Sequence, residues 1–372
     1  MPGSPDPADR SRVVVAVPPA LRAQLFTAEG GGGRGGRPGA GRPRPARGAP
    51  PARPPPHYPP GGGAVRRRAA DLTVLDEHRD RAAVAAALPG ARALITSWGA
   101  PRVDAGLLAP ADRLELVAHT GSAVAPYVTE EVFRRGVLVT QAGDEMARPV
   151  AEVALAFTLS LLHRVHRFDH ALRGGATWEA AGQAPPRHEI HGSDIGVIGA
   201  SRTGRAYIAL VRAMGARVGV SDPYLSEADA RELGVERVPL DVLLSRSRIV
   251  AVHAPVTEET HRMISAAQLA LMPDGAGLVN TARSWLVDEE ALLAELSSGR
   301  LDAAIDVFDA EPLPVDHPFR SLPNVLLTPH QAAGSVECRQ RLGASAVDEV
   351  LRLLSGRPPL HAVTADALAR LH

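Results

Sequence analysis

The chain of 372 residues contains no lysine and a single cysteine, Cys338. All 41 of its basic residues are therefore arginine. The absence of lysine excludes Schiff-base chemistry, a phosphate-loop lysine and a Ser-Lys dyad, because each of these needs a lysine amine. A single cysteine excludes an internal disulfide and a zinc site built on several cysteines, and it is typical of a protein from a reducing compartment.

Long apolar runs are also missing. No uninterrupted apolar stretch reaches the ~18 residues that a membrane-spanning helix needs. Residues 1–6 (Met-Pro-Gly-Ser-Pro-Asp) do not have the basic region followed by an apolar one with which a signal peptide opens. We therefore expect a cytoplasmic globular protein without a membrane partner. Its length and its hydrophobic content of 45% allow two domains, each with its own core.

The formal net charge is zero but unevenly distributed. Nine arginines and no acidic residue lie between residues 30 and 70, so the rest of the chain carries a formal charge of −9. An acidic body argues against nucleic acid as the main partner. Residues 28–69 are rich in Gly, Pro and Arg with almost nothing to bury, and we expect them to form a disordered insert. A tolerated surface insertion is the simpler interpretation. An RNA-binding or proline-recognition segment is the alternative, although Tyr58 is its single aromatic residue for stacking.

A strand, a turn, a helix and a second strand are predicted between Asp194 and Asp222. The apolar run 195–198 reaches a turn at Gly199, a helical pattern follows over residues 203–214, and a second apolar run ends at Asp222. This order is the outline of the strand-helix-strand unit that binds dinucleotides.

The turn of this unit has the features that hold phosphates. Gly199 allows a tight turn, Gly204 allows the helix to pack closely on the strand, and the helix N-terminus attracts a pyrophosphate. Asp222 is placed to accept the ribose hydroxyls of adenosine, so we expect NAD in preference to NADP. Ser201 occupies the position of the second glycine in Gly-x-Gly-x-x-Gly, which makes the fingerprint imperfect. A chance pattern is the alternative in a chain with 35 glycines.

Apolar runs that fit buried strands alternate with helical patterns through most of the chain, which predicts parallel sheets with helices on both faces. In the first part the expected strands are 12–18, 72–75, 93–95, 114–118 and 137–139, and the expected helices are 79–88 and 130–135. In the second part the further strands are 248–252, 277–279, 303–307 and 324–327, with helices at 265–272 and 289–296. Pro149 opens a long helical pattern over 150–166, and a last helix over 335–354 leads to an edge strand at 361–364.

Polar residues follow the expected carboxyl ends of several strands, where function collects in an open parallel sheet. They are Asp222, residues 280–283 (Asn-Thr-Ala-Arg), Asp306 with Glu311, and residues 328–330 (Thr-Pro-His). Taken singly, Arg283 fits a surface arginine, Glu311 a helix-start carboxylate and His330 a loop histidine. Together they supply a cation for a carboxylate, a carboxylate and an imidazole beside a nucleotide site.

These residues lie in blocks that carry a family resemblance. The blocks are 149–152 (PVAE), 196–204, 221–223 (SDP), 252–257 (VHAPVT) with Thr260, 279–283 (VNTAR), 305–308 (IDVF) through 311–313 (EPL), and 327–330 (LTPH). With them the chain resembles the D-isomer-specific 2-hydroxyacid dehydrogenase family, except in its N-terminal tail and the insert. The resemblance implies an α/β fold with two doubly wound parallel-sheet domains, a Rossmann NAD-binding domain inserted into a smaller flavodoxin-like substrate domain, and a homodimer.

The resemblance also implies the domain limits. Residues 1–145 would form the first part of the substrate domain, residues 146–334 the dinucleotide-binding domain, and residues 335–372 would return to the substrate domain. The implied reaction is hydride transfer between NAD(H) and a 2-oxoacid/D-2-hydroxyacid pair of the hydroxypyruvate, glyoxylate or phosphoglycerate type. The alternative is an NAD(H)-sensing regulatory protein on the same fold.

Residue roles are implied in the same way. Arg283, Glu311 and His330 would be catalytic, and Thr120, Gly121 and Arg283 would hold the substrate carboxylate. NAD would contact Gly199, Ser201, Arg202, Thr203, Gly204, Asp222, Ala254, Pro255, Thr260, Thr281, Ala282, Arg283, Asp306 and His330, with Asp306 at the nicotinamide end. No metal is expected, since arginine and histidine polarise the carbonyl.

Three departures from the family pattern leave the substrate open. Ser201 replaces a glycine, Ser284 follows the catalytic arginine where glycine is usual, and the loop 119–122 (His-Thr-Gly-Ser) differs from the usual one. Candidate pocket walls are Trp98, Thr120 and Met146.

Overall fold

The computed structural model describes residues 11–25 and 70–369. They form two compact units. Unit 1 contains the described residues up to Gly121 together with Tyr127–Gln141 and Arg339–Ala362, and unit 2 contains Ser122–Pro126, Ala142–Cys338 and the residues from Val363 on. The expected insert at residues 28–69 lies outside the described residues.

The unit limits differ from the expected ones at the C-terminus. We expected all of residues 335–372 in the first domain, whereas the residues from Val363 on group with unit 2. The division falls within the short strand β13 (Ala362–Val363), the edge strand of the first sheet, and the helix α13 (Ala365–Ala369) follows it.

Unit 1 is built on a sheet with the strand order β13-β5-β4-β3-β1-β2. Its strands are β1 (Ser11–Ala16), β2 (Ala70–Val74), β3 (Ala91–Thr96), β4 (Leu116–His119), β5 (Leu138–Gln141) and β13. The accompanying helices are α1 (Pro19–Leu25), α2 (Arg81–Ala87), α3 (Glu130–Arg134) and most of α12 (Val336–Leu354). Strands β1 to β5 pair in parallel and follow the 2-1-3-4-5 order of flavodoxin-like sheets. The central strands are almost entirely buried, as strands covered on both faces are.

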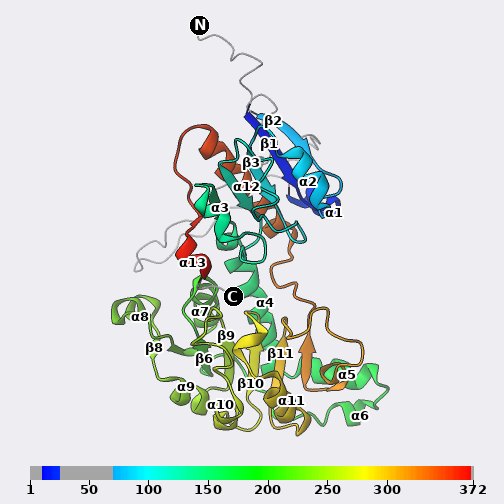
Figure 1. Cartoon of the computed structure of the whole chain (residues 1–372). Coiled ribbons are helices and arrows are strands. Elements are labelled where there is room, and N and C mark those ends of the chain that lie inside the picture. The colour runs from blue at the N-terminus through cyan, green and yellow to red at the C-terminus, as the bar shows by residue number, and fades with distance from the viewer. Residues whose placement is uncertain (1–10, 26–69, 370–372) are drawn as a thin grey trace, which may run out of the picture. The chain divides into compact units, whose positions relative to one another are not determined.

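Unit 2 is built on a larger sheet with the order β12-β11-β10-β9-β6-β7-β8. Its strands are β6 (Asp194–Ile198), β7 (Arg217–Ser221), β8 (Glu236–Arg237), β9 (Ile249–Val252), β10 (Gly277–Asn280), β11 (Asp302–Ile305) and β12 (Val325–Leu327), all paired in parallel (Figure 1). Counted from β6, the first strands follow the 3-2-1-4-5-6 order of a Rossmann fold, which confirms the predicted class.

The helices of unit 2 divide between the two faces of its sheet. They are α4 (Ala147–Leu162), α5 (Val165–Arg173), α6 (Trp178–Ala181), α7 (Arg202–Ala213), α8 (Glu227–Leu233), α9 (Leu240–Arg246), α10 (Ala266–Leu271) and α11 (Glu289–Ser297), with short 3-10 turns η2 (Gly143–Met146), η3 (Ser284–Leu286) and η4 (Pro318–Ser321). Side chains of α9, α10 and α11 pack on one face, together with Ile198 and Val252. Those of α4 and α7 pack on the other, together with Val197 and Ala251. Successive side chains of each strand thus point to opposite faces of the sheet and pack into two separate hydrophobic cores.

The long helix expected over residues 150–166 is interrupted. Helix α4 ends at Leu162, and Arg164 takes a left-handed conformation with φ 56° before α5 begins. The side chain of Arg164 is buried in an ion pair with Asp302, a contact that a helical pattern cannot reveal. Among the residues that the structure describes, no helix is both long and apolar enough to cross a bilayer.

Candidate active site

The turn after β6 is shaped by two glycines. Gly199 has φ 91°, and a Cβ atom there would lie 2.6 Å from the backbone N and Cα of Ala254. A Cβ atom on Gly204 would run into the carbonyl oxygen of Gly199. Both positions therefore require glycine, and the space they leave lets a phosphate approach the turn and the N-terminus of α7.

Ser201 fits this turn without strain. Its φ of −62° and ψ of 178° are extended backbone open to any residue, and its hydroxyl accepts the N–H of Gly204 at 3.2 Å as the N-cap of α7. The serine replaces the missing glycine with a helix cap, a role that its position just before the helical pattern could have indicated. The next residue, Arg202, forms an ion pair with Asp144, and burial lowers the pKa of its guanidinium.

Asp222 is fixed at the end of β7. Its Oδ2 accepts the N–H of Ala200 at 2.7 Å and its Oδ1 accepts the N–H of Tyr224 at 2.8 Å. Each carboxylate oxygen keeps a second lone pair, so the half-buried carboxylate can still accept the two hydroxyls of a ribose.

The loops after β9 and β10 form the opposite side of the turn. Thr260 donates its hydroxyl to the carbonyl of Pro255 at 2.7 Å and fixes the loop that carries Ala254. Asn280 closes the next loop, because its side chain accepts the N–H of Ala282 at 3.1 Å. The Thr281 hydroxyl is buried and has no partner among the described residues. An orphaned buried hydroxyl beside a glycine-shaped turn fits a ligand with polar groups, as a dinucleotide has.

Arg283 follows β10 directly. One of its guanidinium nitrogens donates to the carbonyl of Ala282 at 2.7 Å, and the residue is exposed. Partial burial of the guanidinium lowers the pKa of Arg283 and the charge of Glu311 raises it, so the carboxylate acts on the guanidinium electrostatically. Since the side chain is reached by solvent and arginine deprotonates only far above neutral pH, we treat Arg283 as a permanent cation.

His330 and Glu311 form a hydrogen-bonded pair. His330 Nδ1 lies 2.7 Å from Glu311 Oε2, and Glu311 Oε1 accepts the N–H of Phe308 at 3.0 Å. An ionised carboxylate only accepts, so Nδ1 carries the proton and Nε2 is directed to other partners. The two side chains are 47% and 37% exposed, which leaves the imidazole within reach of a substrate.

Asp306 has a role that the sequence did not reveal. Its side chain is buried and accepts the Thr328 hydroxyl, the N–H of Gln331 at 2.9 Å and the N–H of Ala332 at 3.0 Å. These donors flank His330, whose φ of 51° is left-handed and costs a non-glycine residue about 1–2 kcal/mol. We expected Asp306 at the nicotinamide end of the cofactor. In the structure its carboxylate holds the loop that carries His330.

The expected substrate clamp lies in unit 1, and one half of it needs correction. The N–H of Thr120 donates to the carbonyl of Thr96 at 2.9 Å and its hydroxyl donates to Ser97 at 2.9 Å, so Thr120 is committed to its own sheet. Gly121 makes no backbone hydrogen bond to a described residue. A Cβ atom on Gly121 would lie 2.7 Å from Nε2 of the buried His119, so the position requires glycine.

Within residues 11–25 and 70–369, no three His, Cys, Asp or Glu side chains are grouped as metal ligands would be.

Comparison with known proteins identifies the family. The family profile "D-isomer specific 2-hydroxyacid dehydrogenase, NAD binding domain" matches residues 155–332. A glyoxylate reductase of Korarchaeum cryptofilum is 33% identical over 269 residues, which cover 72% of this chain and 81% of that protein. The chain belongs to the D-isomer-specific 2-hydroxyacid dehydrogenase family. The predicted family is thereby confirmed.

Other members of the family extend the comparison. A D-3-phosphoglycerate dehydrogenase of Mycobacterium leprae is 37% identical over 288 residues, 77% of this chain and 54% of that protein. The chain thus spans about half the length of the phosphoglycerate dehydrogenases that it resembles. A phosphoglycerate oxidoreductase structure from Rhizobium etli superposes with a TM-score of 0.67 at 27% identity, over 96% of this chain and 98% of the other.

The family profile identifies the part of unit 2 that binds NAD. Its range, residues 155–332, includes the glycine turn, Asp222, Arg283 and the His330–Glu311 pair. The cofactor predicted from the turn, NAD, is therefore confirmed. The glycine turn and the polar residues at the strand ends all lie within the matched segment.

Proposed function

We propose that this chain is an NAD-dependent oxidoreductase that transfers a hydride between NAD(H) and a 2-oxoacid/D-2-hydroxyacid pair. The observation that carries the proposal is the His330–Glu311 pair, 2.7 Å apart, on loops that follow the same sheet edge as Arg283 and the glycine turn. This arrangement supplies a proton donor and a carboxylate-binding cation beside a dinucleotide site.

Each residue has a distinct task in this reaction. Bound NADH supplies the hydride. Arg283 holds the substrate carboxylate and carbonyl oxygen, because its planar fork of N–H donors matches two acceptors at once. His330 donates a proton from Nε2 to the carbonyl oxygen and takes it back in the oxidation direction. Glu311 stabilises the protonated imidazole and fixes its orientation, and Asp306 holds the loop.

Residues of the turn would hold the cofactor. Gly199, Ser201, Thr203 and Gly204 surround the pyrophosphate position, with Arg202 adding positive charge. Asp222 would accept the ribose hydroxyls and repel a 2′-phosphate, which favours NAD over NADP. Thr281 would offer its orphaned hydroxyl to the bound cofactor.

A panel of 2-oxoacids tests the proposal. NADH oxidation would be followed by absorbance with hydroxypyruvate, glyoxylate, pyruvate and a phosphorylated 2-oxoacid. We expect saturable turnover with at least one of them. If the chain binds NADH tightly and turns over none, the alternative of an NAD(H)-sensing regulatory protein replaces the enzyme. The His330–Glu311 pair and Arg283 favour the enzyme, because a sensor needs no proton donor.

The assembly and the location are also proposals. We infer a homodimer in the cytoplasm, supported by the single cysteine and by large apolar side chains that are exposed on α5 and α6: Val165 at 53%, Leu172 at 46% and Trp178 at 81%. Light scattering of the purified chain gives the oligomeric state, and a monomer at micromolar concentration would overturn it. We propose no nucleic-acid partner, and RNA binding that disappears when residues 30–64 are deleted would contradict this.

A further inference from the structure

A polar cavity of about 380 Å³ lies in unit 2, at the end of the sheet opposite to the glycine turn. It is lined where strands begin: Asp194 opens β6, Arg217 opens β7, Arg248 precedes β9 and Ala276 precedes β10. The glycine turn and Arg283 follow the carboxyl ends of the same strands. A strand of four or five residues separates the two ends by roughly 13–17 Å, so this cavity is distinct from the candidate active site.

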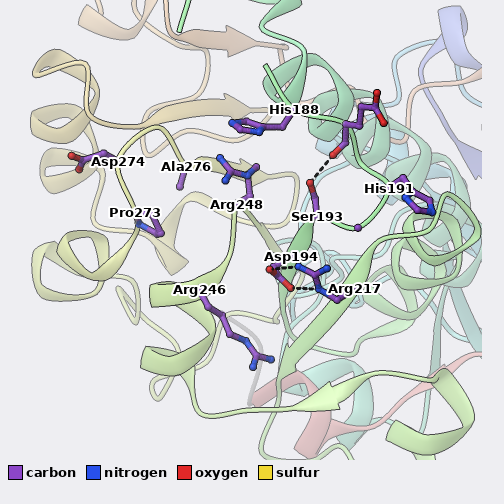
Figure 2. A pocket seen from close by; sticks show the side chains of 12 residues that line it. His188, His191, Ser193, Asp194, Arg217, Arg246, Arg248, Pro273, Asp274 and Ala276 are labelled. Carbon is purple, nitrogen blue, oxygen red and sulfur yellow. Dashed lines mark hydrogen bonds and ion pairs between the residues drawn. The ribbon is translucent and has the colours of Figure 1, made fainter. Parts of the chain in front are cut away.

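Arg248 stands in this cavity without a partner. Its side chain makes no hydrogen bond or ion pair with any residue in the described ranges, although the residue is half-buried. The other arginines of the wall are engaged, Arg217 with Asp194 at 2.7 Å and Arg246 with Glu236 at 2.7 Å. Figure 2 shows the Arg248 guanidinium directed toward the ring of His188. The half-buried guanidinium therefore has five N–H donors that find no acceptor among the described residues.

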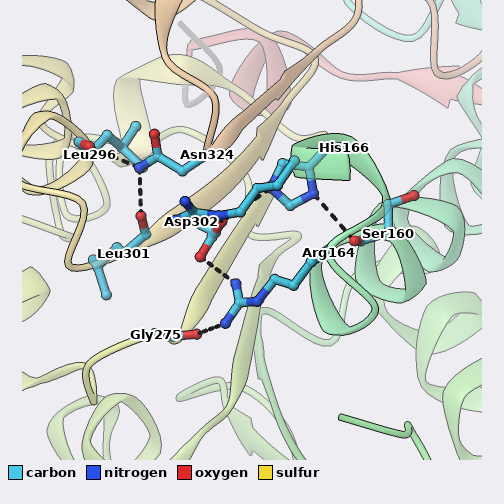
Figure 3. A network of polar contacts seen from close by, with 9 residues as sticks. Ser160, Arg164, His166, Gly275, Leu296, Leu301, Asp302 and Asn324 are labelled. Atoms are coloured by element: carbon cyan, nitrogen blue, oxygen red, sulfur yellow. Dashed lines mark hydrogen bonds and ion pairs between the residues drawn. The ribbon is translucent and has the colours of Figure 1, made fainter. Parts of the chain in front are cut away.

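Arg164 does not line the cavity but acts on it electrostatically. It is buried, donates to the carbonyl of Gly275 at 2.9 Å and pairs with the carboxylate of Asp302 (Figure 3). Arg167 shares that carboxylate. Burial lowers the pKa of His188, and the charges of Arg248 and Arg164 lower it further, so both arginines act on this ring. The carboxylate of Asp194 also feels the charge of Arg248, but both of its oxygens accept hydrogen bonds from Arg217.

Acidic groups at the rim are engaged or turned to solvent. The Asp274 side chain is 89% exposed and lies 3.7 Å from Arg300. Glu189 is exposed, and it does not contribute to the shift at His188. The cavity therefore presents the guanidinium of Arg248, which has no partner among the described residues, and the ring of His188 beside it.

We propose that this cavity binds the oxyanion group of a small metabolite, a phosphate or a carboxylate, with Arg248 as the bidentate ligand and His188 as the second donor. A guanidinium fork matches both kinds of oxyanion, and the cavity has the size of a small-ligand site. Arg248 and the nearby Arg164 supply the positive charge that a bound anion offsets, and the His188 ring supplies an N–H donor. The proposal does not depend on the reaction at the active site.

Calorimetry with inorganic phosphate, glycerol phosphate and succinate tests the proposal. The titrations use the full chain at constant ionic strength, with saturating NADH so that the glycine turn cannot take up phosphate. We expect saturable binding of at least one anion below ~10 mM. Preference between phosphate and succinate distinguishes the two oxyanions. Absence of saturable binding by any of the three anions in the presence of NADH would overturn the proposal.

Variants assign the binding to the cavity. Arg248→Gln should weaken binding at least ~10-fold, equivalent to about 1.4 kcal/mol. Arg173→Gln is the matched control, since it removes the same charge from an exposed pair with Asp169 outside the cavity, and it should leave the affinity within about twofold. Equal losses in both variants would mean general electrostatic attraction and would contradict a built site. If Arg248→Gln does not fold, His188→Gln should show the same loss.

Nuclear magnetic resonance of the His188 ring gives a second readout. A bound anion offsets the charges of Arg248 and Arg164, so the pKa of His188 should rise when phosphate is added. The chemical shifts of the ring of the exposed His191, which also lines the cavity, should change less when the anion is added. An unchanged His188 titration at saturating anion would overturn the assignment of the ligand to this cavity.

Discussion

Glu311 Oε2 lies 2.7 Å from His330 Nδ1, and the other oxygen of the same carboxylate accepts the N–H of Phe308 at 3.0 Å. The carboxylate is thus anchored to the backbone while it orients the imidazole. Asp306 restrains the loop from the other side by accepting the N–H groups of Gln331 and Ala332. Two carboxylates from the loop after β11 therefore fix one left-handed histidine on the loop after β12.

The Glu311→Gln variant tests how the pair works. Glutamine can still accept from Nδ1 but has no charge to favour the protonated imidazole. We expect kcat/KM for 2-oxoacid reduction to fall, but by less than in a variant that removes the imidazole, with NADH affinity unchanged. The measurement is steady-state reduction at a fixed pH beside NADH binding. An unchanged kcat/KM would mean that Glu311 only supports the loop.

Asp222 is expected to select the cofactor. Asp222→Asn keeps the shape of the side chain and removes the charge that repels a 2′-phosphate. The ratio of kcat/KM for NADH to that for NADPH should fall, by about tenfold if one charge contact of ~1.4 kcal/mol is lost. Asp229→Asn, an exposed carboxylate on α8, is the control and should leave the ratio unchanged. Equal efficiency with both cofactors before any substitution would also contradict the assignment.

The buried Asp302 is expected to stabilise unit 2. Burial raises the pKa of Asp302, but hydrogen bonds from His166 and Arg167 and the charge of Arg164 outweigh it and hold the pKa below the usual value. Asp302→Asn leaves buried cations without a counterion and should cost about 3 kcal/mol in the free energy of unfolding. Asp169→Asn breaks an exposed pair and should cost less than about 1 kcal/mol. Denaturant titration compares the two, and equal losses would contradict the account.

The ionisation of Asp302 also gives a pH dependence. Its folded pKa is lower than its unfolded value of about 4, so the stabilisation is present above pH ~4 and is lost as pH falls through the folded value.

The buried His119 should make the folded state less stable at mildly acidic pH. Burial lowers the pKa of His119 to about 4, while an unfolded histidine titrates near 6.5. Between these values only the unfolded state takes up the proton, so stability is unaffected above pH ~6.5 and falls as pH decreases toward 4. At pH 5 the loss is about 2 kcal/mol. His119→Gln should flatten the decline in melting temperature between pH 7 and 5. If the melting temperature of this variant declines as steeply as that of the natural chain, a group other than His119 causes the loss of stability.

Much of the fold follows from local sequence signals. The strand 195–198 and the helix 203–214 were placed within about one residue of β6 and α7, because an apolar run, a glycine turn and an amphipathic pattern are written in neighbouring residues. Glu311 and His330 could be named from their blocks. Their mutual contact needed the structure, since it joins loops that lie 19 residues apart.

Contacts between residues distant in the sequence explain what was missed. Arg164 takes a left-handed conformation between α4 and α5 and pairs with Asp302, 138 residues away. Thr120 was expected to clamp a carboxylate, but its N–H already donates to Thr96 on the neighbouring strand. Asp306 holds the His330 loop through N–H groups 25 and 26 residues further along the chain. None of these contacts could be predicted from neighbouring residues. The periodicity of apolar side chains indicates which residues are buried, but not which distant residue each one contacts.

The rate of a single turnover with His330→Gln tests the central claim most directly. The enzyme, loaded with NADH, would be mixed with its best 2-oxoacid, and the loss of NADH absorbance would be followed beside NADH affinity measured by fluorescence. Glutamine keeps the size of the side chain but cannot transfer the proton. We predict a rate ~100- to 10,000-fold lower than that of the natural enzyme, with NADH affinity unchanged. A near-normal rate would show that the proton comes from another group and would contradict the account.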